Sequence, residues 1–153
     1  MKISTKGRYA LRMMVDLAEN QGDGYVSLKD IAARQEISKK YLEQIVAVLN
    51  KPGMLRTNRG YQGGYRLAKN ANEYTVGDIL RLTEGGLAPV ACLETTPMQC
   101  NRADSCATLP VWKGLYDVVN KYLDSITLQD IVDNDVSTQN FGYVRHRQNS
   151  FEF

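Results

Sequence analysis

Apolar residues repeat at helical spacing in three segments of the first part of the chain. Residues three and four positions apart lie on one face of a helix, so each repeat predicts a helix with one buried face. The three sets are Ala10, Met13, Met14, Leu17 and Ala18, then Leu28, Ile31 and Ala32, then Leu42, Ile45, Val46 and Leu49. The sequence therefore predicts three short helices before Pro52.

A repeated capping motif marks the helix starts. A Ser or Thr is followed three residues later by Asp in SLKD at Ser27, TVGD at Thr75 and TLQD at Thr127. The hydroxyl accepts a hydrogen bond from an unpaired backbone N–H, and the carboxylate suits the positive end of the helix. Ser38 is expected to cap the third helix. These motifs predict four helix starts.

A β-hairpin is predicted after the third helix. Pro52 and Gly53 end that helix, and two short β-prone runs, residues 55–57 and 65–67, flank a glycine-rich tip. Three short helices followed by such a hairpin are typical of a winged helix-turn-helix.

The second half of the chain has a different pattern. A fourth helix is predicted around Val76, Ile79 and Leu80, and a wide apolar stripe follows the cysteine segment. We interpret that stripe as a dimerisation helix, because a small monomer has too few other helices to cover it. The alternative is that it packs on its own domain. The expected interface residues are Trp112, Leu115, Val119, Tyr122 and Leu123.

The predicted fold class is mainly α with a small β-hairpin wing, that is, a winged helix-turn-helix plus a long dimerisation helix. Its expected parts are a DNA-binding region at 1–70, a connecting helix at 71–90, a cysteine loop at 91–108, the dimerisation helix with a short terminal helix at 109–134, and a flexible tail at 135–153.

Charge is distributed unevenly along the 153 residues. Residues 1–70 carry thirteen Lys or Arg and six Asp or Glu, a balance of +7, whereas residues 71–153 carry six and eleven, a balance of −5. The basic part is suited to bind a polyanion.

The sequence contains no run of eighteen apolar residues and no signal-peptide pattern at its start, so we expect a cytoplasmic protein without a membrane partner. In a reducing compartment, three clustered cysteines are expected to be thiols or metal ligands rather than disulfides.

The third predicted helix has the polar face of a recognition helix. Beside its buried stripe, Ser38, Lys39, Lys40, Glu43 and Gln44 lie near the helix N-terminus, where such a helix enters the major groove. The lysines suit phosphates, the Glu suits a cytosine amino group and the Gln suits adenine. The simpler interpretation is a solvated helix face.

The hairpin supports DNA binding, because Arg59 stands beside Gly60 at its tip, with Arg56 and Arg66 on the strands. A wing arginine that enters a narrow minor groove is a known way of reading DNA shape. A plain surface hairpin is the alternative. Two adjacent elements of this kind, both in the basic part, favour DNA binding.

No catalytic constellation is evident, and GYQGGY lacks the strand-to-helix context of a phosphate-binding loop, so no enzymatic role is expected.

Four segments carry a resemblance to a known family: MKISTKGRYALRMMVDLA, ISKKYLEQI, RGYQGGYRLAK and CATLPVWKGLYDVVNKYLDSITLQDIV. From Met1 to about Val132 the chain resembles the IscR-type (Rrf family) winged-helix regulators, a bacterial group with nitric-oxide-sensing NsrR-type and cysteine-metabolism CymR-type members. The resemblance implies a homodimer that binds double-stranded operator DNA through the third helix and the wing. With it, the predicted DNA-binding residues are Ser38, Lys39, Lys40, Tyr41, Glu43, Gln44, Arg59 and Gly60.

The resemblance also implies a 2Fe-2S cluster on three cysteines, which match Cys92, Cys100 and Cys106, with the cluster-assembly machinery as a further partner. The spacing Cys-x7-Cys-x5-Cys lacks the Cys-x2-Cys pairs and the fourth ligand of a structural zinc site, which favours a larger cofactor.

This sequence departs from the family at the fourth ligand. A histidine three residues after the last cysteine serves in some relatives and an acid on the first helix in others, but these positions hold Leu109 and Arg8. A guanidinium has no lone pair for iron. The remaining candidates are a water or small thiol and the side chains of Asp104, Glu94, Asn101 and His146.

Other functions remain open at this point. Some relatives have lost the cluster, so a cluster-free thiol-based or partner-protein-regulated repressor of sulfur or cysteine metabolism is the main alternative. Another bound metal, an iron–sulfur electron carrier and a pure interaction module that docks on a metabolic enzyme are further alternatives.

Overall fold

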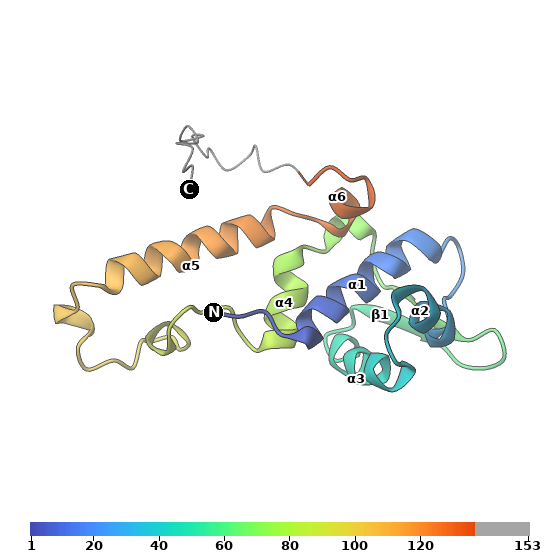
Figure 1. Ribbon diagram of the computed structural model, residues 1–153, viewed down its shortest axis with the longest axis horizontal. Helices are drawn as coiled ribbons and strands as arrows, with labels where there is room; N and C mark the ends of the chain where they lie inside the picture. Colours follow the sequence, from blue (N-terminus) through green and yellow to red (C-terminus); the bar gives the residue numbers. More distant parts are fainter. Residues whose placement is uncertain (137–153) are drawn as a thin grey trace, which may run out of the picture.

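The computed structural model describes residues 1–136, so most of the predicted tail lies outside the described residues. The elements in chain order are α1 (Thr5–Asn20), α2 (Leu28–Gln35), α3 (Lys39–Asn50), β1 (Leu55–Asn58), β2 (Gly64–Leu67), η1 (Ala71–Glu73), α4 (Val76–Glu84), η2 (Ala91–Leu93), η3 (Ala103–Ser105), α5 (Leu109–Asp124) and α6 (Leu128–Val132). The helices α1–α4, the hairpin and α6 form one body, from which α5 projects (Figure 1).

The predicted capping motifs are confirmed. The hydroxyls of Ser27, Ser38, Thr75 and Thr127 each accept a hydrogen bond from a backbone N–H in the first turn of α2, α3, α4 and α6. At Thr75 and Thr127 the following Asp bonds back to the cap residue, which completes a capping box. Local sequence therefore sets the starts of these helices.

The core forms where the predicted apolar stripes meet. Met13, Leu17, Ile31, Leu42 and Ile45 are fully buried in one cluster that also takes residues from the hairpin and α6. Burial of such side chains contributes about 1.5–3 kcal/mol each, which makes this cluster the main source of stability.

An ion pair between a buried carboxylate and a partly exposed arginine joins α1 to α2. The carboxylate of Asp16 is only 1% exposed and accepts hydrogen bonds from Arg34 Nη2 (2.7 Å) and Nε (3.0 Å). Gln35 Nε2 donates a third bond, of 2.9 Å, to the same carboxylate. Hydrogen bonding to Asp16 is the largest cause of a raised pKa of Arg34. Because every bond joins residues far apart in the sequence, the pair fixes the angle between the two helices.

The hairpin is antiparallel, with Arg56 opposite Arg66 and Thr57 opposite Tyr65. Val26 extends it, since its N–H and carbonyl exchange 2.8 Å hydrogen bonds with Tyr65. A Cβ atom on Gly64 would lie 2.3 Å from the Val26 carbonyl oxygen, so this close approach requires glycine. The segment before α2 thereby anchors the base of the wing.

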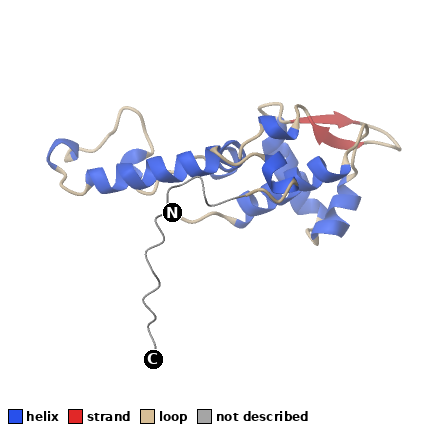
Figure 2. Cartoon of the chain, turned by 90° about the horizontal axis from the view of Figure 1, so that it is seen from above, coloured by secondary structure: helices blue, strands red, loops and turns tan. Residues whose placement is uncertain are grey.

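The helix α5 is contacted mainly by α4 among the described elements. Leu109 is its only buried residue, and the cysteine loop runs beside it to its N-terminal end (Figure 1). Seen from above, α5 extends away from the hairpin end of the molecule (Figure 2). The helix ends at Asp124. No helix within residues 1–136 is long and apolar enough to cross a membrane.

Candidate nucleic-acid interface and cysteine loop

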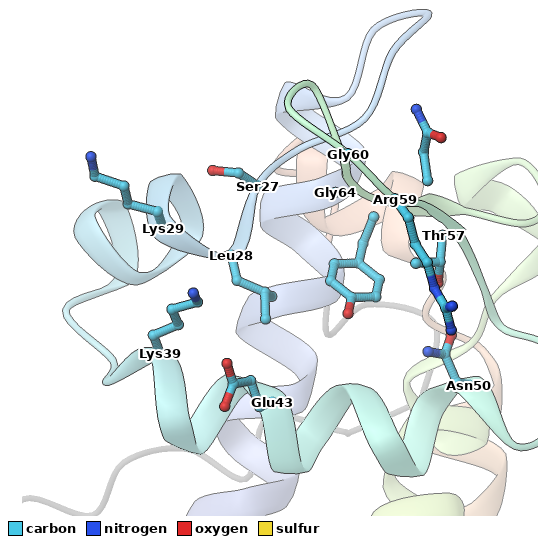
Figure 3. Close-up of a pocket in the computed structure, with 13 residues that line it drawn as sticks. Ser27, Leu28, Lys29, Lys39, Glu43, Asn50, Thr57, Arg59, Gly60 and Gly64 are labelled. Carbon is cyan, nitrogen blue, oxygen red and sulfur yellow. The ribbon is translucent and has the colours of Figure 1, made fainter.

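A groove of about 670 Å³ separates α3 from the hairpin and the start of α2. Figure 3 shows Lys29 and Lys39 on one side of it, Glu43 on α3, and Arg59 extending from the hairpin toward Asn50. The lining residues are Ser27, Leu28, Lys29, Lys39, Glu43, Asn50, Thr57, Asn58, Arg59, Gly60, Gly63, Gly64 and Tyr65. Three cations around an open groove suit a polyanionic backbone.

Helical periodicity determines which side chains of α3 reach the groove. Leu42 and Ile45 are buried against the core, so the opposite face, with Lys39 and Glu43, points outward. The Ser38 hydroxyl accepts a hydrogen bond of 3.2 Å from the Tyr41 N–H, which starts the helix at the edge of the groove. The N-terminal turn of α3 is thus exposed and positively charged.

The structure brings together part of the predicted DNA-binding set. Lys39, Glu43, Arg59 and Gly60 line the groove. Ser38, Lys40 and Gln44 are exposed near the start of α3 but do not line it. Tyr41 is half-buried, with its ring edge-on to Tyr9 at 5.6 Å between centroids. Tyr41 therefore orients α3 on α1 and presents less surface to a ligand.

Several residues of the groove were not predicted from the sequence. Lys29 is the charged residue among them. The capping motif SLKD could have located it, because Lys29 stands in the first helical turn between the cap Ser27 and Asp30. Asn50, Thr57 and Asn58 also line the groove and supply polar groups. No local signal identifies Asn50, since its position depends on how the hairpin packs against α3.

The three cysteines are free thiols with partly exposed side chains. Within residues 1–136, no three His, Cys, Asp or Glu side chains converge closely enough to hold a metal ion. The donor chemistry of Cys92, Cys100 and Cys106 suits a soft metal or cluster, but this conformation does not assemble them. Binding of such a group would require the loop to rearrange.

The thiol of Cys106 lies beside a hydroxyl group. Its Sγ lies 3.5 Å from the Thr108 hydroxyl. Hydrogen bonding to Thr108, first through the side chain and then the backbone, lowers the pKa of the Cys106 thiol. A lowered pKa favours the thiolate, which is the form that binds metals and attacks electrophiles.

The positions at which a fourth cluster ligand was expected or proposed differ in burial. Leu109 is buried at the start of α5, and its side chain has no donor atom for a metal. Arg8 is exposed, and its Nη2 donates 3.1 Å to the Thr5 hydroxyl. Asp104 lies exposed in η3, as do Glu94 and Asn101 elsewhere in the loop, and His146 lies outside the described residues.

The helix α5 presents two different apolar faces. Tyr116 and Leu123 pack against the buried residues Val76, Leu80 and Leu87 of the same chain. Trp112 and Leu115, with Val111 and Val118, remain 37–62% exposed. The sequence-predicted stripe therefore divides, with Leu123 on the inward face, while Val119 and Tyr122 are half-buried.

A polar contact joins α4 to α5. Arg81 Nη1 donates 2.9 Å to Asn120 Oδ1, and its Nη2 forms an ion pair with Asp124. Gly77 leaves room for this pair, because a Cβ atom there would overlap the Asp124 carboxylate. This contact, called here the Arg81 contact, couples the winged-helix body to α5.

Comparison with known proteins gives the family. Residues 3–134 match the family described as "Rrf2: Iron-dependent Transcriptional regulator". The chain is 42% identical over 131 residues to the HTH-type transcriptional regulator CymR of Bacillus subtilis, covering 86% of this chain and 89% of that protein. It is 39% identical over 134 residues to the HTH-type transcriptional regulator IscR of Pectobacterium atrosepticum, covering 88% and 80%.

Solved structures show the same fold. The structure of CymR, titled the global cysteine regulator of B. subtilis, aligns with a TM-score of 0.73 at 40% identity, covering 88% of this chain and 98% of that one. IscR of T. potens aligns with a TM-score of 0.72 at 42% identity, covering 88% of each. The similar proteins are named as transcriptional regulators and not as enzymes, which agrees with the expectation of no catalytic role.

Proposed function

The chain belongs to the Rrf2 family of transcriptional regulators, and from this premise we propose that it is a homodimer that binds double-stranded operator DNA through α3 and the wing. The groove that gathers Lys29, Lys39 and Arg59 beside the exposed start of α3 is the observation that carries the proposal. The exposed face of α5 supports the dimer, because Trp112 and Leu115 would lose water contact against a second copy.

Within this proposal, the four charged residues of the groove have distinct physical roles. Lys29 and Lys39 neutralise backbone phosphates, which supplies affinity without sequence preference. Glu43 is an acceptor on the outward face of α3 and can discriminate bases by their amino groups. Arg59, at the far side of the groove, enters the minor groove from the wing. In this arrangement, α3 contacts the major groove of the DNA, and the wing contacts the minor groove of the same duplex.

Substitution of Arg59 by Ala tests the DNA-binding proposal. The change is expected to weaken binding to a cognate duplex by about 1–3 kcal/mol, measured by fluorescence anisotropy with duplexes selected from genomic fragments. Arg102→Ala is the matched control, because Arg102 is an exposed arginine in the cysteine loop and should leave affinity unchanged. Equal affinity of the Arg59→Ala protein and the unsubstituted chain would remove the wing from the interface.

We propose that the cysteine loop receives the signal, and the first candidate is a 2Fe-2S cluster on Cys92, Cys100 and Cys106. Three thiols within one loop, all partly exposed, support this candidate. Such a cluster would need the loop to close and a fourth ligand from water, a small thiol or a nearby side chain such as Asp104. Supply of the cluster by assembly proteins is an expectation of this candidate alone.

A cluster-free thiol sensor that represses genes of sulfur or cysteine metabolism is the second candidate. The observations that favour it are the unassembled cysteines, the buried Leu109 and the lowered pKa of Cys106. The similarity to CymR, whose structure is titled that of a cysteine regulator, is as high as the similarity to IscR. In this candidate the Cys106 thiolate is the reacting group.

Anaerobic purification separates the two candidates. A coloured protein with about two iron and two sulfide per chain supports the cluster, and Cys100→Ala should then abolish the visible absorption while leaving a folded dimer. A colourless protein with no bound iron, whose DNA affinity changes after mild thiol oxidation, supports the thiol sensor. Ser105→Ala, in the same loop, is the matched control and should change neither result.

A further inference from the structure

A second cluster of cations lies on the hairpin face that points away from the groove. Side chains of paired residues on an antiparallel hairpin point to the same side, and successive pairs alternate. Thr57 and Tyr65 line the groove, so the neighbouring pair, Arg56 and Arg66, points to the opposite face. There a pocket of about 360 Å³ is lined by Gln21, Arg56, Arg66, Leu67, Ala68, Lys69, Asn70 and Glu73.

The charges of this pocket are poorly balanced. Like charges directly opposite each other on a hairpin are destabilising, yet Arg56 and Arg66 are paired in this way. Lys69 adds a third cation, and within residues 1–136 no salt bridge engages any of the three. The one carboxylate in the lining, that of Glu73, accepts a 3.0 Å hydrogen bond from the Asn70 N–H. An anion in the pocket would therefore balance its excess of positive charge.

One donor in the pocket is buried without a partner, and a second lies on a side chain that is held in place. Arg66 Nη1 donates 3.0 Å to the Asp23 carbonyl and its guanidinium lies over the Tyr25 ring, which fixes the side chain. Its Nε is buried and has no hydrogen-bond partner in the described chain. Gln21 Oε1 accepts 2.8 Å from the Leu67 N–H, and no bond from the Gln21 amide NH₂ group occurs among the described residues. The unpaired buried Nε of Arg66 is suited to a bound acceptor.

We propose that this pocket binds an oxyanion of the phosphate or sulfate class. Arg56 and Lys69 would neutralise its charge, while Arg66 and Gln21 are positioned to orient it through hydrogen bonds. The position of the pocket, on the face away from α3, favours a free anion or a small molecule that carries one. A backbone phosphate of DNA presents the same chemistry and is the other source.

Titration of free sodium phosphate, at ionic strength held constant with sodium chloride, tests the proposal by backbone-amide NMR. The amides of Leu67 and Lys69 should shift with saturation in the low millimolar range, and the double variant Arg56→Gln/Lys69→Gln should weaken binding by at least about tenfold. Arg102→Gln/Lys51→Gln is the matched control, because it removes the same charges from exposed positions outside the pocket.

A second arm identifies the source of the oxyanion. The same amides are followed while a DNA duplex is added without phosphate. A response to free phosphate identifies a small-molecule site, and a response to DNA alone, lost in Arg56→Gln/Lys69→Gln, assigns the pocket to a backbone phosphate. Absence of both responses, or responses that the double variant leaves unchanged, overturns the proposal. The single variant Arg56→Gln repeats the test with one charge removed should the double variant fold poorly.

Discussion

The winged-helix body and α5 bury their apolar residues to very different extents. In the body, each helix stripe meets another, and Met13, Ile31 and Leu42 are fully buried. In α5, a stripe of similar length leaves Trp112 at 37% and Leu115 at 41% exposure. The body therefore satisfies its own hydrophobic pattern within one chain, whereas α5 requires a second surface.

The polar contacts of the two regions differ in the same way. The Asp16 carboxylate in the body is buried and holds bonds from Arg34 and Gln35. The Arg81 contact on α5 is 34% exposed at Arg81 and 45% at Asp124, so water screens it. Buried charges lose much when one partner is removed, and exposed pairs lose little. Because only Asp16 is buried, loss of its arginine partner is expected to cost more than loss of Arg81.

A charge on the exposed face of α5 is expected to have the largest effect, because this face is proposed to bind a second copy of the chain. Trp112→Asp should raise the dimer dissociation constant by about a thousandfold, about 4 kcal/mol, because an unpaired carboxylate replaces an apolar anchor. Sedimentation equilibrium measures the change. Lys113→Asp, an exposed position on the far face of the same helix, should stay dimeric. A dimer that survives Trp112→Asp would place the interface elsewhere.

Removal of Arg34 should destabilise the body. Arg34→Ala leaves the Asp16 carboxylate, 1% exposed, with Gln35 as its remaining side-chain partner. The expected loss in free energy of unfolding is about 3 kcal/mol, measured by urea denaturation. Lys29→Ala on the same helix is an exposed control and should lose under about 0.5 kcal/mol. A loss that small for Arg34→Ala would contradict a structural role for the pair.

Removal of the Arg81 contact should cost much less. Arg81→Ala is expected to lower the free energy of unfolding by about 0.5–1 kcal/mol, since both partners are partly exposed. The same urea denaturation compares it directly with Arg34→Ala. If Arg81→Ala proved as destabilising as Arg34→Ala, the expected difference between the two contacts would be contradicted.

The smallest expected effect is a change in the titration of Cys106. Because Thr108 lowers its pKa, the rate of Cys106 alkylation in a Cys92→Ala/Cys100→Ala background should rise at a lower pH than that of an ordinary thiol. Thr108→Val removes the hydroxyl donor and should shift the profile to higher pH. Thr95 is exposed in the same loop, so Thr95→Val is the matched control. Coincident profiles with and without Thr108→Val in that background would exclude the hydroxyl as the cause.

Much of the body was predictable from sequence because its signals are local. The caps at Ser27 and Thr75 lie within three residues of the donors they satisfy. The hairpin prediction was one residue short on each strand, at Asn58 and Gly64, since strand ends depend on pairing and not on propensity. The family resemblance is confirmed by the match over residues 3–134.

The long-range features could not be predicted in this way. The bonds between Asp16 and Arg34 join positions 18 residues apart, and no spacing rule identifies them. The division of the α5 stripe, with Leu123 facing its own chain, depends on how α4 packs. The arrangement of the cysteines likewise depends on loop conformation, so their number and spacing predict donor chemistry but not an assembled site.

The salt dependence of duplex binding tests DNA recognition by the winged-helix body most directly. The logarithm of the association constant, measured by fluorescence anisotropy on the unsubstituted chain, should fall linearly with the logarithm of salt concentration, by about 0.9 per phosphate contacted. The combined variant Lys29→Gln/Lys39→Gln should reduce the steepness of this slope by the amount expected for the loss of about two phosphate contacts. A slope near zero, or one that the combined variant leaves unchanged, would contradict binding through the groove between α3 and the hairpin.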